Sequence, residues 1–177
     1  MVRVAGASLL DVARRAQGGD RAARDELLRV LYEVVRKHLF YVLGGGGLTE
    51  DAVQETMIAL YRGLGGFRGD ANPRTWALTI ATRTAMRVRR KEARYVATGE
   101  VDAEVFDVDT AAAAEMVMLQ RALATLTDKK REAFVLMSIF ELTADEAGHV
   151  LSTFANTAAS RNRHACAELE RYLEEKL

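Results

Sequence analysis

Hydrophobic residues recur every three or four positions along most of the chain, which is the pattern of helices with one buried face. In the first half this pattern runs through 9–16, 27–43, 53–64 and 76–88. No stretch shows the sustained alternation of apolar and polar residues that is typical of a half-buried strand. The first half of the chain is therefore predicted to be a helical lobe.

Two glycine clusters separate the predicted helices. Gly18 and Gly19 precede Asp20 and end the first helix, and four consecutive glycines at 44–47 separate the second helix from the third. A glycine run can also form a phosphate-binding loop, but that loop requires a following Gly-Lys-Ser/Thr, which this sequence lacks. The run is predicted to be a plain flexible loop.

The last third of the chain predicts a helix-turn-helix. Apolar positions between 117 and 140 favour two helices. Thr143 and Glu146 then have the spacing of a capping box, which predicts the start of a short helix. The turn 152–156 separates this short helix from a longer one that begins at Thr157. A short helix, a tight turn and a longer helix form the order of a DNA-binding helix-turn-helix.

The formal net charge is zero, but the charges are unevenly distributed. Residues 1–97 hold 17 Lys/Arg and 10 Asp/Glu, a net charge of +7. Residues 98–114 hold five acidic residues and no basic one, and residues 115–177 hold eight basic and ten acidic residues. A basic first half favours contact with nucleic acid, because Lys and Arg neutralise phosphates.

These observations predict an all-α protein of two small helical domains, 1–97 and 115–177, joined by a flexible acidic linker at 98–114. The acidic part of the linker cannot bury enough apolar surface to order itself. The alanines at 111–114 are expected to open the next helix.

Composition argues against several other classes of protein. The single cysteine, Cys166, excludes an internal disulfide and fits a reducing compartment, which predicts a cytoplasmic protein. No apolar run approaches the roughly 18 residues of a membrane span, and the N-terminus does not resemble an export signal. The three histidines are scattered and no hydrolase motif is present, so we expect no metal, no cofactor and no catalytic residue.

The predicted helix over 49–64 has two distinct faces. One is an apolar stripe of Val53, Met57, Leu60 and Leu64. The opposite face carries Asp51, Gln54, Glu55, Ile58 and Arg62. Such a face is either solvated or a surface that docks another protein, and the pattern alone leaves both interpretations open.

The segment 67–76 mixes aromatic and basic residues in a loop that precedes a helix, which suits single-stranded nucleic acid with its unstacked bases. Trp76 is expected in the core, whereas Phe67 is undecided between the core and a base-stacking position. The following helix carries Arg83, Arg87, Arg89, Arg90, Lys91 and Arg94. We predict a phosphate-tracking surface on this helix, and the alternative is a solvated basic face.

Three segments of the first lobe, 19–23, 49–55 and 67–81, closely resemble region two of sigma-70 family factors of the extracytoplasmic-function group. Residues 126–173 resemble region four of the same family. The segments follow the order and spacing of the family.

This resemblance implies a bacterial sigma factor that is monomeric when free, with core RNA polymerase, promoter DNA and an anti-sigma factor as partners. Residues implied to dock on core polymerase are Asp51, Gln54, Glu55 and Ile58. Residues implied to hold the melted strand of the minus-ten element are Phe67, Arg68, Asp70, Asn72, Arg74, Arg83 and Arg87. Residues implied to contact duplex DNA of the minus-thirty-five element are Thr157, Ser160, Arg161 and Arg163.

The chain departs from the family at several positions. Arg83 stands where asparagine is usual and Gly148 where alanine is usual, and Ala159, His164 and Cys166 occupy positions that are often basic. Fewer cations release fewer counterions from DNA, so the C-terminal lobe is expected to bind duplex weakly. A second interpretation is therefore a degenerate sigma-like regulator that binds polymerase or a partner protein but recognises promoters poorly.

Overall fold

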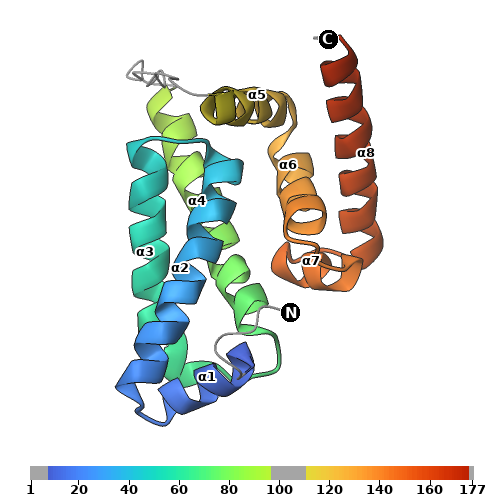
Figure 1. Cartoon of the computed structure of the whole chain (residues 1–177). Coiled ribbons are helices and arrows are strands. Elements are labelled where there is room, and N and C mark those ends of the chain that lie inside the picture. Colours follow the sequence, from blue (N-terminus) through green and yellow to red (C-terminus); the bar gives the residue numbers. More distant parts are fainter. Residues whose placement is uncertain (1–7, 97–110, 176–177) are drawn as a thin grey trace.

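The computed structural model describes residues 8–96 and 111–175, and all regular structure within these ranges is helical (Figure 1). The elements are α1 (Leu9–Gln17), α2 (Arg21–Leu43), α3 (Gly47–Gly63), the short 3₁₀ helix η1 (Leu64–Gly66), α4 (Pro73–Val96), α5 (Ala111–Thr125), α6 (Asp128–Phe134), the π-helical turn η2 (Val135–Ile139), α7 (Ala144–Val150) and α8 (Ala155–Glu174). The predicted all-α class is confirmed. Most of the predicted linker, its residues 98–110, lies outside the described residues.

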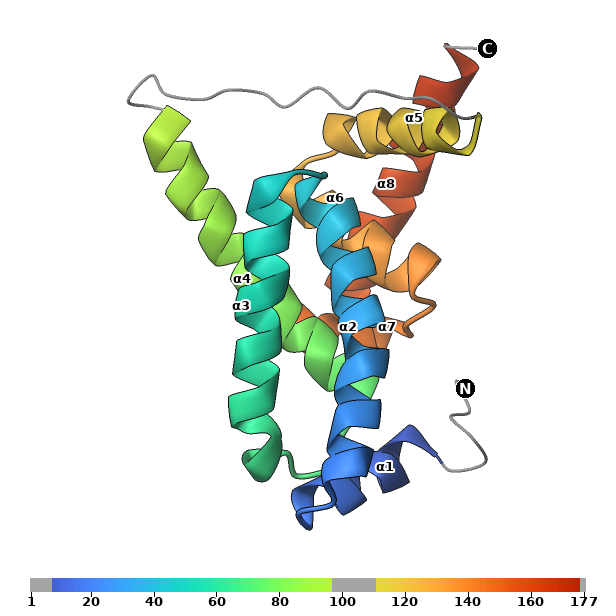
Figure 2. The same ribbon diagram turned by 60° about the vertical axis from the view of Figure 1, so that its left-hand side comes forward.

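The N-terminal lobe consists of α1 to α4. The long helices α2, α3 and α4 lie side by side, and α1 packs across one end of them (Figures 1 and 2). Two side chains fix where the first helices begin. The backbone N–H of Asp11 donates to Ser8 Oγ at 3.2 Å, and that of Ala23 donates to the Asp20 carboxylate at 3.0 Å. These caps satisfy N–H groups that a helix start leaves without partners.

The four-glycine run ends α2 and begins α3. Gly44 and Gly46 have φ angles of 93° and 91°, in the left-handed region that glycine adopts without a steric penalty. Thr49 Oγ1 then donates to the carbonyl oxygen of Gly44 at 2.7 Å. The run therefore serves as a tight connection between antiparallel helices, and α3 begins at Gly47, two residues before the predicted start.

The C-terminal lobe consists of α5 to α8, and its local structure follows the sequence signals closely. The alanines open α5, as predicted. The capping box is present, since the Glu146 backbone N–H donates to Thr143 Oγ1 at 3.3 Å and the Thr143 backbone N–H donates to the Glu146 carboxylate at 2.9 Å. The helices α7 and α8 form the predicted helix-turn-helix, with α8 beginning at Ala155.

The two lobes pack against each other along α2 and α4 (Figure 2). Leu136, Phe140, Ala147 and Val150 of the C-terminal lobe belong to the same buried cluster as the core of the N-terminal lobe. The hydrophobic pattern does not predict this contact, because periodicity shows that a face is buried without showing its partner. A continuous core therefore crosses the boundary between the two predicted domains.

Polar contacts join the lobes at the C-terminal end of α2. Gln120 Nε2 donates to the carbonyl oxygen of Phe40 at 2.9 Å, and the Arg131 guanidinium donates to that of Val42 at 3.1 Å. Positive groups are favourable here, because the last carbonyls of a helix carry its negative dipole end. Arg89 and Glu132 complete this group, as described below.

His38 lies at the contact between the lobes and is fully buried. Its Nε2 atom is 3.0 Å from Thr82 Oγ1, and the edge of its ring meets Phe140 at a centroid distance of 5.9 Å. Burial, together with the positive charge of Arg89, lowers the pKa of His38 to about 3. The imidazole is therefore neutral in the folded protein near neutral pH.

Replacing His38 with glutamine is expected to flatten the acid dependence of stability. The unfolded imidazole takes up a proton below its ordinary pKa of about 6.5, whereas the buried one does not until about pH 3. The wild type should therefore lose up to about 1.4 kcal/mol more stability per pH unit than the variant as pH falls below 6.5. Urea unfolding at pH 7, 6 and 5 measures this slope, and equal slopes would contradict the buried neutral state.

Candidate functional site

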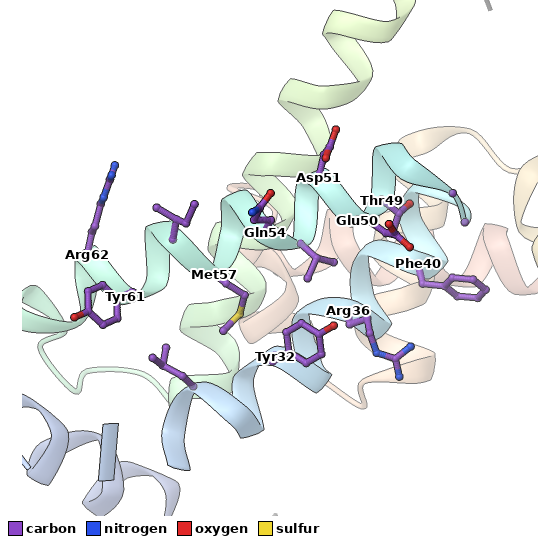
Figure 3. A pocket seen from close by; sticks show the side chains of 15 residues that line it. Tyr32, Arg36, Phe40, Thr49, Glu50, Asp51, Gln54, Met57, Tyr61 and Arg62 are labelled. Carbon is purple, nitrogen blue, oxygen red and sulfur yellow. The ribbon is translucent and has the colours of Figure 1, made fainter. Parts of the chain in front are cut away.

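An open groove of about 1180 Å³ runs between α2 and α3 (Figure 3). Tyr32 of α2 and Ile58 and Tyr61 of α3 line it and are 43%, 45% and 53% exposed. Met57 points from α3 toward the side of the groove formed by α2, and Asp51 points away from α2 (Figure 3). The groove thus combines exposed apolar side chains with polar ones at its rim, which is the character of a protein-docking surface.

The structure brings three of the four predicted docking residues to this groove. Asp51, Gln54 and Ile58 line it. Glu55 instead forms an ion pair with Arg87 of α4, with 2.5 Å between Oε1 and Nη1. The hydrogen bond from Arg87 holds the pKa of the Glu55 carboxyl below its usual range. Glu55 therefore lies on the side of α3 that meets α4.

The half of the groove formed by α2 was not predicted. Tyr32 and Arg36 line it but belong to a helix for which the sequence indicated only core positions. A signal was present, because Tyr32 lies on the outer face of α2, where an aromatic side chain is not needed for the core. The guanidinium of Arg24, which is also on α2, lies 5.3 Å from the centre of the Tyr61 ring on α3 and supports it.

A second, smaller pocket of about 280 Å³ lies at the start of α4. It is lined by the loop 66–71, by Trp76 and Arg83 of α4, and by His149 of α7. Gln17 of α1 anchors this loop by hydrogen bonds. Its Nε2 atom donates to the carbonyl oxygen of Leu64 at 3.0 Å and to that of Phe67. The walls of this pocket therefore come from both lobes.

The loop presents charged side chains to solvent. Arg68 and Asp70 are 84% and 68% exposed at the side chain and form an ion pair at 3.0 Å. Asn72 Oδ1 accepts a hydrogen bond from the backbone N–H of Arg74 at 2.9 Å, close to the start of α4. Asn72 therefore orders the backbone at the start of this helix as well as lying at the edge of the loop.

Phe67 does not offer a free aromatic face. Its side chain is 7% exposed, and its ring packs against Trp76 with 5.0 Å between centroids. The sequence left Phe67 undecided, and the structure places it in the core because its apolar ring closes the end of the bundle. Trp76 was expected in the core, yet it is only partly buried and lines the pocket. Trp76 is thus the aromatic ring beside the loop.

The basic residues of α4 divide among three surroundings. Arg83 is exposed and lines the pocket, whereas Arg87 pairs with Glu55. Arg89 turns inward, with its side chain 13% exposed, 3.0 Å from Asp128 and 3.7 Å from Glu132. Most of this charge was predicted to face outward, and Arg89 is an exception because α6 covers it.

Glu132 of α6 is buried at the contact between the lobes. Burial raises the pKa of its carboxyl to about 7, although the neighbouring Arg89 acts in the opposite direction. Together with Arg131, these side chains bind α6 to the ends of α2 and α4. Arg89 and Glu132 are thus structural groups of the contact between the lobes.

The last predicted site is the outer face of α8. Arg163 is exposed, whereas Thr157, Ser160 and Arg161 are partly buried. Asn162 turns toward η2, where its Oδ1 accepts a hydrogen bond from Ser138 Oγ at 3.0 Å. The helix is held against the lobe by its buried residues Ala158, Ala165 and Leu169.

Within the described ranges, no helix is long and apolar enough to cross a membrane. The same residues contain no group of three or more side chains arranged to hold a metal ion.

Comparisons with known proteins agree with this geometry. Residues 21–95 match the family description Sigma-70 region 2. The chain is 30% identical over 156 residues to the ECF RNA polymerase sigma factor SigM of Mycobacterium tuberculosis. The matched region covers 88% of this chain and 79% of SigM. The chain belongs to the extracytoplasmic-function family of RNA polymerase sigma factors. This sigma factor is also 29% identical to the ECF RNA polymerase sigma-E factor of Salmonella typhimurium, over 85% of the chain and 86% of that protein.

Solved structures share the fold of this sigma factor. CnrH in complex with the cytosolic domain of CnrY matches with a TM-score of 0.75 and 21% identity, over 95% of this chain and 98% of the other. RpoE in complex with the anti-sigma factor NepR from Bartonella quintana matches with a TM-score of 0.76 and 20% identity, over 85% of this chain and 96% of RpoE. The arrangement of helices in both lobes is therefore that of known sigma factors.

Proposed function

We propose that this sigma factor docks on core RNA polymerase through the α2–α3 groove and directs promoter recognition and melting through the pocket at the start of α4 and through α8. The observation that carries the proposal is the separation of the two surfaces. The groove and the pocket share no lining residue, so polymerase and a DNA strand can occupy them together.

The groove suits a helical partner. Its exposed apolar side chains, Tyr32, Ile58 and Tyr61, can bury the apolar face of a helix, while Asp51 and Gln54 at the rim can pair with polar groups. The clamp helices of the largest polymerase subunit, to which region two docks by resemblance, are partners of this kind. Glu55, paired with Arg87, is placed by this proposal at the edge of the interface.

The pocket suits an unpaired strand. Arg68 and Arg83 supply positive charge for phosphates, and Trp76 supplies an aromatic surface beside them. Asp70 also lines this pocket, and Asn72 and Arg74 lie next to it in sequence at the start of α4. These three residues are proposed to orient the strand. Phe67 also lines the pocket, but we propose no stacking role for its ring, which is 7% exposed and packs against Trp76.

We also propose an anti-sigma factor as a partner and the cytoplasm as the place of action, where the polymerase is found, with no catalytic activity of the chain alone. Both solved structures named above are complexes, one with the cytosolic domain of CnrY and one with the anti-sigma factor NepR.

The competing hypothesis, a degenerate regulator that binds polymerase without recognising promoters, is favoured by one observation. The outer face of α8 carries few cations, with alanine at position 159 and histidine at 164.

Gel filtration of the full chain with core polymerase tests the docking. A one-to-one complex at physiological salt is expected, and its absence at low salt would contradict the proposal. A complex that forms but enriches no promoter sequence from a randomised DNA pool would support the degenerate regulator instead.

Replacing Arg83 with alanine is expected to weaken binding of the melted strand about tenfold without affecting the complex with polymerase, since one charge-assisted contact is lost. The slope of log affinity against log salt should decrease by roughly 0.7, the value for one phosphate on a single strand. Binding of a fluorescent single strand to the reconstituted holoenzyme measures both. Arg171→Ala in the last turn of α8 is the control, because Arg171 is exposed and lines neither the groove nor the pocket. Equal losses in the two variants would contradict a specific role for Arg83.

A further inference from the structure

Phe154 has the most exposed side chain among the large hydrophobic residues that the structure describes, at 84%, compared with 53% for Tyr61. It lies in the turn between α7 and α8, directly before the first residue of α8. The ring therefore contributes little to the core. Its position at the start of the proposed DNA-contacting helix indicates a role in binding.

The turn that carries Phe154 is held rigidly by close backbone packing. A Cβ atom at Gly148 would lie 2.9 Å from the carbonyl oxygen of Thr153 and 3.1 Å from the backbone nitrogen of Ala155. The backbone N–H of Thr153 also donates to the carbonyl oxygen of Gly148 at 2.9 Å. The outward direction of Phe154 is thus fixed by the residues on both sides of it.

Phe154 also occupies a position at which a different residue would stabilise the helix. It is the N-cap residue of α8, and its side chain makes no capping hydrogen bond. Serine, threonine, asparagine and aspartate are preferred there because their oxygens accept from the free N–H groups. A locally unfavourable residue in an exposed position is typical of a functional site.

Phe154 stands at the N-terminal end of α8, close in sequence to two residues already proposed to contact DNA. Thr157 follows it by three positions and Arg161 by seven, and Thr157 and Arg161 share one face of α8 because they are four residues apart. In a helix-turn-helix, the residues at the N-terminal end of the second helix are the ones that reach base edges. An aromatic ring at this end faces the major groove when α8 enters it.

The apolar feature of the major groove is the 5-methyl group of thymine. We propose that Phe154 contacts a thymine methyl in the minus-thirty-five element and acts as a specificity-determining residue. This inference rests on the proposed function, because it requires α8 to enter duplex DNA. The contact would supply affinity that the cation-poor helix lacks, and it would do so without dependence on salt, because it neutralises no phosphate.

The test uses holoenzyme reconstituted from core polymerase and the full chain. A pool of randomised duplexes is enriched on this holoenzyme, and each thymine of the enriched upstream element is then replaced by deoxyuridine, which lacks only the methyl group. Deoxyuridine at one position should weaken wild-type binding about fourfold, the effect of leaving one buried methyl group without a partner. The Phe154→Ala holoenzyme should bind the thymine duplex about tenfold more weakly.

The decisive comparison combines the Phe154→Ala substitution with the deoxyuridine replacement. Deoxyuridine at that position should not change the affinity of the Phe154→Ala holoenzyme, and the dependence of its affinity on salt should equal that of the wild type. Phe154→Leu, which keeps an apolar side chain, should retain part of the discrimination. Because Phe154 is exposed, these variants are expected to fold normally, and circular dichroism checks this.

Three results would overturn the inference. The first is equal binding by the wild type and Phe154→Ala, and the second is equal sensitivity of both to deoxyuridine. The third is a loss of polymerase binding with unchanged DNA discrimination, which would assign the ring to a protein contact. In each of these cases the holoenzyme still enriches a promoter, so the proposed function stands. If the holoenzyme fails to form or enriches no sequence, the result contradicts both the inference about Phe154 and the proposed function.

Discussion

Replacing Ile58 with aspartate is expected to weaken the complex with core RNA polymerase by at least about 100-fold, which corresponds to about 3 kcal/mol. Ile58 is 45% exposed and lines the groove between α2 and α3. An unpaired carboxylate in the apolar part of a closed interface has no partner to offset its loss of water. Fluorescence anisotropy of the labelled chain with increasing core polymerase measures the affinity.

The matched control is Ala59→Asp. Ala59 is the next residue of α3 and is also exposed, but it does not line the groove. The same charge in the same helix should leave the affinity within about threefold of wild type, as expected of a surface substitution away from the interface. Wild-type affinity of Ile58→Asp, or equal losses in both variants, would show that polymerase docks elsewhere.

Replacing Gly148 with alanine, the residue usual at this position in the family, is expected to destabilise this chain by about 2 kcal/mol and to weaken duplex binding by α8, because the turn in this chain is packed closely around glycine. The added Cβ would lie 2.9 Å from the carbonyl oxygen of Thr153, and backbone atoms cannot move aside as a flexible side chain can. The turn between α7 and α8 would have to open, which would change the angle between the two helices. Urea unfolding measures the stability, and binding of the holoenzyme to an enriched promoter measures the effect on DNA.

Gly65→Ala is the control for this substitution, because a Cβ at Gly65 meets no atom within 4 Å. Its stability should lie within about 0.5 kcal/mol of wild type. Docking on core polymerase should persist in Gly148→Ala, since the groove lies in the other lobe. Unchanged stability of Gly148→Ala would contradict the close packing of this turn.

Signals within a few residues of one another allowed much of the C-terminal lobe to be predicted. Thr143 and Glu146 form a capping box within one helical turn, and their spacing alone indicated where α7 begins. The alternation of α7, turn and α8 followed from polar residues between two amphipathic segments. The predicted helix starts were less accurate, since α8 begins two residues before the predicted Thr157.

Contacts between distant segments were beyond the sequence pattern. Glu55 and Arg87 are 32 residues apart, and nothing in either helix indicates that they pair. The packing of Phe140 against His38 likewise depends on how the two lobes meet. Only the α3 side of the groove was predicted, because the polar face of α3 is visible in the sequence. The α2 side forms only when the two helices pack together.

The sequence also left the role of aromatic residues undecided. Phe67 and Trp76 lie in one aromatic and basic segment and both line the pocket, yet the Phe67 ring is 7% exposed and closes the end of the bundle, whereas Trp76 is only partly buried. Phe154 belongs to the polar turn, and its exposure becomes visible only when the backbone on either side is placed. Exposure is a tertiary property, and a local pattern does not determine it.

Promoter opening by reconstituted holoenzyme tests the central claim most directly. The full chain is mixed with core polymerase and with a promoter fragment enriched by that holoenzyme, carrying 2-aminopurine in the minus-ten element. The proposed function predicts that fluorescence rises on melting and that run-off transcripts follow, both requiring the full chain. A stable complex that binds the fragment without melting or transcript would contradict it.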